Sequence, residues 1–206
     1  MAQAEFWYEF ASSYSYPAAM RVEALAAERG VALVWRPFPL GPLFAGQGWR
    51  DSPFNLYPVK GRYMWRDLER ICGALGLPLT RPDPFPQNSL RAARVALALD
   101  DALRPAFSRA VYRAEFAEGR TIDAPATLAA LLAALGVEPE PPLARAIEDA
   151  NKTLLKVQTA RAIALGLPRA PCLTTPDGEV FWGNDRLEQG LDWARAQEPP
   201  TGKART

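Results

Sequence analysis

The stretch that decides the fold is Phe6-Trp7-Tyr8-Glu9-Phe10-Ala11-Ser12-Ser13-Tyr14-Ser15-Tyr16-Pro17. An apolar run of the β type ends abruptly in small hydroxyl residues, and a helical pattern follows at once. This order places Ser12 at the joint between a buried strand and the N-terminus of a helix. The free N–H groups and the positive dipole end of a helix favour an anion at such a joint.

The first part of the chain reads as a β-α-β unit. We expect a strand over residues 4–10, a helix from Tyr14 to Arg29 that Gly30 stops, and a strand from Val31 to Trp35. Such an opening predicts parallel pairing of the two strands with a right-handed crossover.

The last part of the chain predicts a hairpin followed by a helix. Strands are expected over Cys172–Thr175 and Glu179–Trp182, because Asp177-Gly178 between them is a strong hairpin signal. A final helix, capped by Asn184 or Asp185, should run to about Ala196.

Between these parts the pattern is helical. Residues 37–58 are rich in proline, glycine and aromatics and predict a loop with short helical turns. Further helices are expected at Tyr63–Gly73, from a cap at Asn88 or Ser89 to Asp100, and at Pro105–Glu118, Pro125–Leu135 and Leu143–Leu165. The fold class is therefore α/β, a mixed sheet of about four strands with an inserted all-helical subdomain. Residues 1–36 and 166–197 would form the sheet domain, 37–165 the connecting loop and helical insert, and 198–206 a disordered tail.

Composition excludes several classes of function. The chain has 24 Lys and Arg against 23 Asp and Glu and no histidine. This rules out Ser-His-Asp hydrolysis and His-ligated metals, and we expect neither a metal nor a nucleic-acid partner. The sequence shows no signal peptide and no apolar span, which predicts a cytoplasmic protein without a membrane partner. Cys72 and Cys172 are expected to be inert core thiols.

Several polar residues admit both a structural and a functional interpretation. Ser12, in a Ser-x-x-Ser with Ser15, either caps the helix or donates a hydrogen bond that lowers the pKa of a bound thiol. Asn184 and Asp185 either cap the last helix or bind the charged groups of a γ-glutamyl moiety. Lys60 is either solvated or placed near an anionic ligand. One set of aromatic residues either walls an aromatic-substrate pocket or packs as a loop cluster: Trp35, Phe38, Phe44, Trp49, Phe54 and Tyr57.

Three motifs in this order resemble the 2-hydroxychromene-2-carboxylate isomerase family, whose relatives are the kappa-class glutathione transferases. The motifs lie at residues 10–16, 58–64 and 181–187, and the likeness extends over about residues 5–196. The resemblance implies a thioredoxin-like fold in which Ser12 and Ser15 replace both redox cysteines, so that the thiol must come from bound glutathione. It also implies a homodimer.

The resemblance assigns roles residue by residue. Ser12 matches the serine that contacts the glutathione sulfur, Ala170 precedes a cis-proline at Pro171, and Asn184 with Asp185 matches the γ-glutamyl-binding pair. Lys60 matches a lysine of the glutathione and substrate region. Three positions depart from the family pattern: Ser13 replaces proline, Arg169 replaces glycine beside the ligand, and Asp51 replaces a pocket asparagine for which Asn55 could substitute.

The expected activity is glutathione-dependent isomerisation of a small aromatic carboxylate of the 2-hydroxychromene-2-carboxylate type. The steps are thiolate addition, rotation about the former double bond and elimination. A glutathione transferase would use the same thiolate without elimination, and a non-catalytic thiol-peptide-binding protein would need no thiolate at all. Disulfide exchange is excluded, because serine cannot form a mixed disulfide.

Overall fold

The computed structural model describes residues 1–197, and its sheet has four strands in the order β2-β1-β3-β4. Strand β1 (Ala2–Tyr8) pairs in parallel with β2 (Val31–Pro37) and antiparallel with β3 (Cys172–Thr174), which pairs with β4 (Val180–Trp182). The mixed sheet and the parallel opening pair are thereby confirmed. The tail predicted at 198–206 lies outside the described residues.

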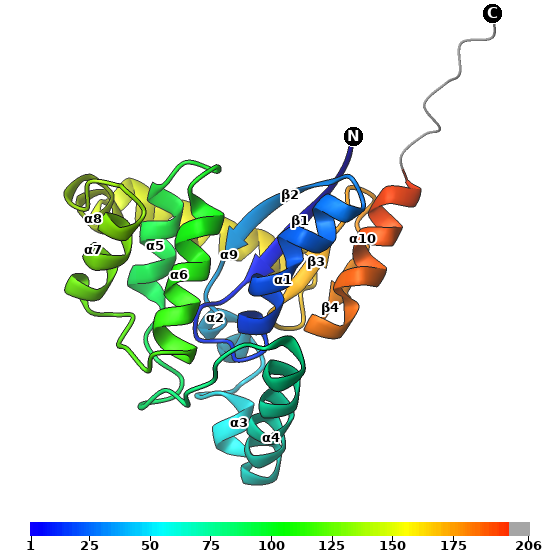
Figure 1. Cartoon of the computed structure of the whole chain (residues 1–206), viewed down its shortest axis with the longest axis horizontal. Coiled ribbons are helices and arrows are strands. Elements are labelled where there is room, and N and C mark those ends of the chain that lie inside the picture. Colours follow the sequence, from blue (N-terminus) through cyan, green and yellow to red (C-terminus); the bar gives the residue numbers. More distant parts are fainter. Residues whose placement is uncertain (198–206) are drawn as a thin grey trace, which may run out of the picture.

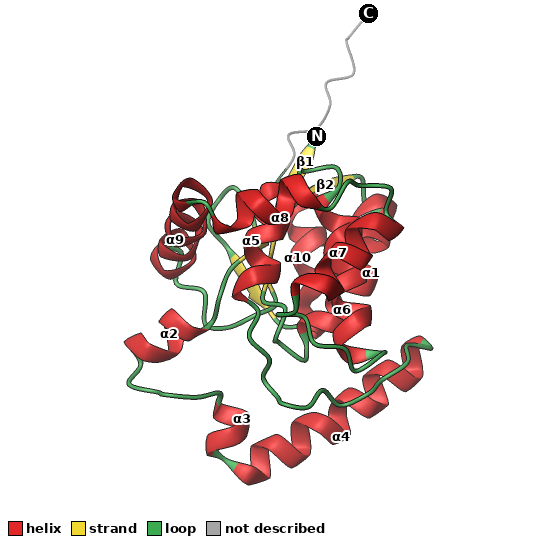
Figure 2. Cartoon of the chain, turned by 90° about the vertical axis from the view of Figure 1, so that its left-hand side faces the viewer, coloured by secondary structure: helices red, strands yellow, loops and turns green. Residues whose placement is uncertain are grey.

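Helices cover both faces of the sheet (Figures 1 and 2). Helices α1 (Ser15–Glu28) and α10 (Leu187–Ala196) lie on one face, and α9 (Asp149–Ala164) lies on the other. The short helices that follow β2 lie with α4 beyond one end of the sheet. The other helices in the described part are α2 Gly41–Gly46, α3 Pro53–Leu56, α4 Pro58–Leu75, α5 Leu90–Ala98, α6 Arg104–Phe116, α7 Pro125–Ala134 and α8 Glu140–Ile147. None of the described helices is long and apolar enough to cross a membrane.

The alternation of side chains along β1 divides the core in two. Phe6 and Tyr8 pack into the larger cluster with α1, α6 and α10, whereas Trp7 points to the opposite face and packs with Phe38 and Ala162. Trp7 is also covered by the Arg161 guanidinium, 5.2 Å from its ring centre. Successive residues of a strand face opposite sides, so residues 6–8, which are buried on both faces of the sheet, are all aromatic.

Two helix predictions need correction. The single helix expected over Leu143–Leu165 is two helices, because Glu148 is extended with φ −68° and ψ 147°, and α9 begins at Asp149. An acidic residue in the first turn favours a new helix start there. Helix α4 begins at Pro58, not at Tyr63, because proline suits a first helical position whose N–H has no partner.

The backbone of Gly61 in α4 lies close to that of Phe54 in α3, so a substitution at Gly61 tests how these two helices pack. A Cβ added at Gly61 would lie 2.3 Å from the Phe54 carbonyl oxygen, whereas one added at Gly73 of the same helix meets nothing within 4 Å. We expect Gly61→Ala to lower the free energy of unfolding by about 1–3 kcal/mol through overpacking. Gly73→Ala, the matched control, should raise it by roughly 0.5–1 kcal/mol. Urea denaturation measures both, and equal effects would contradict this packing.

Candidate functional site

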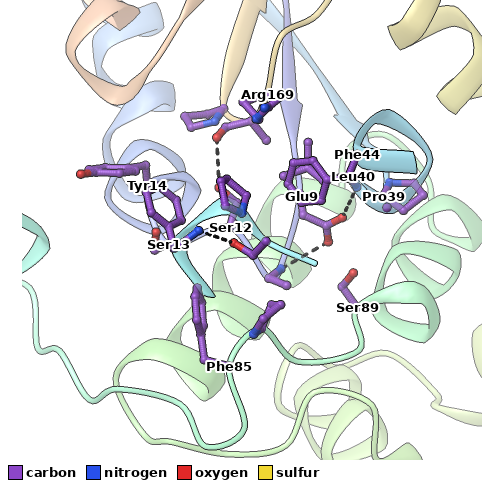
Figure 3. Close-up of a pocket in the computed structure, with 18 of the residues that line it drawn as sticks. Glu9, Ser12, Ser13, Tyr14, Pro39, Leu40, Phe44, Phe85, Ser89 and Arg169 are labelled. Atoms are coloured by element: carbon purple, nitrogen blue, oxygen red, sulfur yellow. Dashed lines mark hydrogen bonds between the residues drawn. The ribbon is translucent and has the colours of Figure 1, made fainter. Parts of the chain in front are cut away.

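Three chain segments meet beyond one end of the sheet. Trp7 pairs with Cys172 and Cys172 with Trp182. The segments that follow β1, precede β3 and follow β4 therefore lie at the same end of the sheet. They line a cavity of about 1240 Å³ together with residues from α2 to α4 and the loop before α5 (Figure 3). Single small-molecule sites usually measure about 300–1,000 Å³. The cavity is therefore larger than a typical site for one small molecule.

Ser12 lies in the turn between β1 and α1, and its hydroxyl crosses to the segment before β3. Its Oγ donates to the Ala170 carbonyl at 3.0 Å, and the Ala170–Pro171 bond is cis. The N-cap of α1 is Tyr14, without a side-chain cap. Ser12 is therefore no helix cap, and Ala170 faces it as the resemblance implies.

A buried carboxylate holds two walls of the cavity together. Glu9, 5 % exposed, accepts the Ala11 N–H at 3.3 Å and the Leu40 N–H at 2.7 Å through its two carboxylate oxygens (Figure 3). Its backbone carbonyl accepts the Ser12 N–H at 3.0 Å. Burial raises the pKa of the Glu9 carboxyl, against hydrogen bonds from Ser89 and the backbone that lower it. Residue patterns do not predict this role, since glutamate at a strand end is usually solvated.

Glu115 of α6 is a second buried carboxyl, electrostatically coupled to Glu9. It is 0 % exposed, and neither carboxylate oxygen has a hydrogen-bond partner within the described part of the chain. Burial raises the pKa of Glu115 well above 4.5, and the charge of Glu9 adds to the effect. The native state therefore binds this proton more tightly than the unfolded chain. Protonated Glu115 therefore makes its full contribution to the stability of the fold below about pH 4.5. This contribution is lost as the pH rises through the pKa of Glu115 in the folded state.

Glu115→Gln should accordingly make the protein more stable, by an amount that grows as the pH rises above about 4.5. The amide keeps the shape of the side chain but removes the buried charge. Glu118→Gln, an exposed residue paired with Arg120 at 3.2 Å, is the control and should change stability little. Thermal unfolding against pH measures both. A gain that does not change with pH above about 4.5 would show that the pKa of Glu115 is not raised in the native state.

Asn184 and Asp185 form the first residues of the 3-10 turn η1 (Asn184–Arg186), which precedes α10. Neither of them caps a helix: no side-chain cap bond is made at the start of η1 or of α10. The capping interpretation is therefore wrong for both. Asn184 is 7 % exposed and its Oδ1 has no hydrogen-bond partner in the described structure, whereas Asp185 is exposed at the cavity rim. A buried oxygen without a donor suits a site that binds a ligand N–H.

Lys60 and Asp51 also line the cavity, but Asn55 does not. The Asn55 amide donates to Asp51 Oδ2 at 3.2 Å and to the Phe85 carbonyl at 3.2 Å, and both of these partners line the cavity. Asn55 therefore bonds to two lining residues without lining the cavity itself, and its substitution for a pocket asparagine stays a prediction. Lys60 is exposed, with its Nζ 4.7 Å from the centre of the Tyr57 ring.

Half of the proposed aromatic set reaches the cavity. Phe44, Trp49 and Phe54 line it, whereas the other three members do not: Trp35 and Phe38 are buried in the core and Tyr57 is exposed outside. Tyr14, Phe85 and Trp182, which the sequence does not single out for this wall, also line it. Both cysteines are buried as expected, and burial raises the pKa of Cys72 to about 11 and that of Cys172 to about 12.

The fold and this site define a thioredoxin-type protein whose strand-to-helix turn faces a cis-proline segment. A family model of the DSBA-like thioredoxin domain matches residues 3–192, and the chain belongs to this family.

Among curated proteins, 2-hydroxychromene-2-carboxylate isomerase from Sphingobium xenophagum is 28% identical over 188 residues, 89% of this chain and 93% of the relative. A solved 2-hydroxychromene-2-carboxylate isomerase structure matches with a TM-score of 0.84 and 26% identity, over 94% of both chains. Cytosolic disulfide reductase DsbM from Pseudomonas aeruginosa, in a structure with GSH, shares the fold at a TM-score of 0.65 and 20% identity, over 94% of this chain and 96% of that one.

Proposed function

We propose that the protein is a glutathione-dependent isomerase of a 2-hydroxychromene-2-carboxylate-type acid. One observation carries the proposal: Ser12 donates to the Ala170 carbonyl at 3.0 Å in the position where a thioredoxin-type site needs a thiol. Both cysteines of the chain are buried, so the sulfur has to arrive with a ligand. The named isomerase relatives, at 28% and 26% identity, support this reaction over others.

The site has groups that fit glutathione. The unpartnered Oδ1 of Asn184 can accept from the γ-glutamyl ammonium, and the Asp185 carboxylate can attract it. When its hydroxyl turns from Ala170 to a bound sulfur, Ser12 stabilises the thiolate and leaves the Ala170 carbonyl free to accept a peptide N–H. Lys60 adds a positive charge at the cavity wall, where it can attract a ligand carboxylate.

When bound, glutathione supplies a thiolate that adds to the conjugated carbon, lets the former double bond rotate and then leaves unchanged. The protein's part is to keep the thiol ionised and to position the acid next to it. The hydroxyl of Ser12 performs the first task. Glu9 supports it by fixing the turn through the Ser12 N–H and the Ala11 N–H. The cavity volume of about 1240 Å³ allows the tripeptide and the acid to bind together.

The deciding experiment incubates the protein with 2-hydroxychromene-2-carboxylate, with and without glutathione, and separates the products by chromatography. An isomerase converts the acid only when glutathione is present and returns all of the glutathione. A conjugate that accumulates in proportion to the consumed acid would instead establish a transferase. Binding of glutathione without any turnover would establish a thiol-peptide-binding protein.

Ser12→Ala should reduce turnover by roughly ten- to a hundredfold, because a hydrogen bond to a charged group is lost. It should also raise the pKa of the bound thiol, read from the ultraviolet absorbance of the thiolate against pH. The control is Ser13→Ala, since the Ser13 hydroxyl contacts Met64 Sδ at 3.0 Å and is 2 % exposed. An unchanged thiol pKa in Ser12→Ala would remove Ser12 from the proposed role.

Asn184→Leu should weaken glutathione binding at least roughly tenfold in calorimetry. Its stability without ligand should be equal to or above that of the wild type, because a buried oxygen without a partner is removed. Asn151→Leu is the matched control: Asn151 is also buried, but its Nδ2 donates to the Arg94 carbonyl at 2.8 Å. This variant should lose stability and keep its glutathione affinity. The reverse pattern would show that Asn184 is a structural residue.

A further inference from the structure

The cavity contains an arginine whose setting the proposed reaction does not yet use. Arg169 directly precedes Ala170 and lines the cavity, with its guanidinium stacked over two aromatic rings of the same wall. The carbon of the guanidinium lies 5.1 Å from the centre of the Phe44 ring and 4.7 Å from that of Trp49. Cation–π contact with two rings restricts the motion of the guanidinium.

The charge of Arg169 is not neutralised by the protein. Within residues 1–197, no carboxylate lies within 4.0 Å of its nitrogens, and its hydrogen bond goes to the neutral Pro168 carbonyl. Partial burial lowers the pKa of Arg169, which shows that the group is held partly away from water. A partly desolvated cation without a partner binds an anion more strongly than a solvated one. By contrast, Lys60 is exposed at its own position.

The backbone places Arg169 beside the residue that Ser12 contacts, and the proposed function puts the thiol sulfur at Ser12. The carbonyl that holds the Ser12 hydroxyl belongs to Ala170, the residue after Arg169. Figure 3 shows Arg169 near Ser12, with Phe44 and Leu40 on the side of Ser12 away from Tyr14. An acid held by Arg169 would therefore lie near Ser12, with its ring system against Phe44 and Trp49.

We propose that Arg169 is the residue that binds the carboxylate of the substrate, a conjugated aromatic acid. This inference rests on the proposed function and assigns the carboxylate to Arg169 in place of Lys60. The planar fork of a guanidinium matches both oxygens of a carboxylate. The glycine end of glutathione carries the same chemical group, but the adjoining aromatic wall favours an acid attached to a ring.

The test compares cinnamate with cinnamamide, which share a conjugated aromatic frame and differ in charge. Calorimetry is carried out on the wild type and on Arg169→Gln, each with and without glutathione. The variant should bind cinnamate at least roughly tenfold more weakly, whereas its affinity for cinnamamide stays the same. The cinnamate affinity of Arg169→Lys should lie between those of the wild type and Arg169→Gln, since lysine keeps the charge but lacks the planar guanidinium.

The matched control is Arg81→Gln. Arg81 also stacks on a tryptophan, 5.0 Å from the centre of the Trp65 ring, but lies outside the cavity. Its cinnamate affinity should equal that of the wild type. Preference for cinnamate over cinnamamide that survives in Arg169→Gln would overturn the proposal. So would a variant that loses affinity for glutathione alone, which would assign Arg169 to the glycine carboxylate.

The outcome for Arg169 can be read separately from the outcome for the proposed function. If the wild type binds no glutathione, the proposed reaction fails, yet the cinnamate titration without glutathione still reports on Arg169. If glutathione binds and turnover occurs, substrate kinetics add a second measure. Arg169→Gln should then raise KM for the acid by roughly tenfold or more, with a smaller change in kcat.

Discussion

The hydrogen bond from the Ser12 hydroxyl to the Ala170 carbonyl joins residues 158 positions apart, and the candidate site depends on it. It exists because β1 lies between its parallel partner β2 and its antiparallel partner β3. That central position brings the end of β1 and the start of β3 to one edge, in the register that pairs Trp7 with Cys172. The chain between β2 and β3 adds walls to the cavity but does not create this contact.

The local order of the fold was predictable because short-range signals specify it. Apolar runs, Gly30 and the Asp177-Gly178 turn act within a few residues, and the β-α-β and β-β-α units follow from them. The sequence does not reveal the break at Glu148, because no proline or glycine lies within residues 143–165. Asn184 and Asp185 were expected to cap a helix, yet the chain forms a 3-10 turn first, and propensity cannot distinguish the two.

The site was predictable only in part, for a similar reason. Ser12 and Ala170 belong to short motifs whose geometry is local, and the structure brings the two together. The position of Asn55 in a loop predicts that it lines the cavity, but its amide donates to the Phe85 carbonyl, 30 residues away. The burial of Glu9 and the stacking of Arg169 arise from the packing of distant segments, which no residue pattern encodes.

The carboxylate of Glu9 has a consequence for the thermodynamics of binding. The carboxylate accepts the backbone N–H groups of Ala11 and Leu40. The backbone carbonyl of Glu9 accepts the Ser12 N–H and, at 2.8 Å, the Tyr112 hydroxyl. The turn is therefore immobilised when the chain folds. A ligand then meets a preorganised surface and loses little affinity to the entropy of ordering it. The turn after β1 is thus ordered by folding, before any ligand binds.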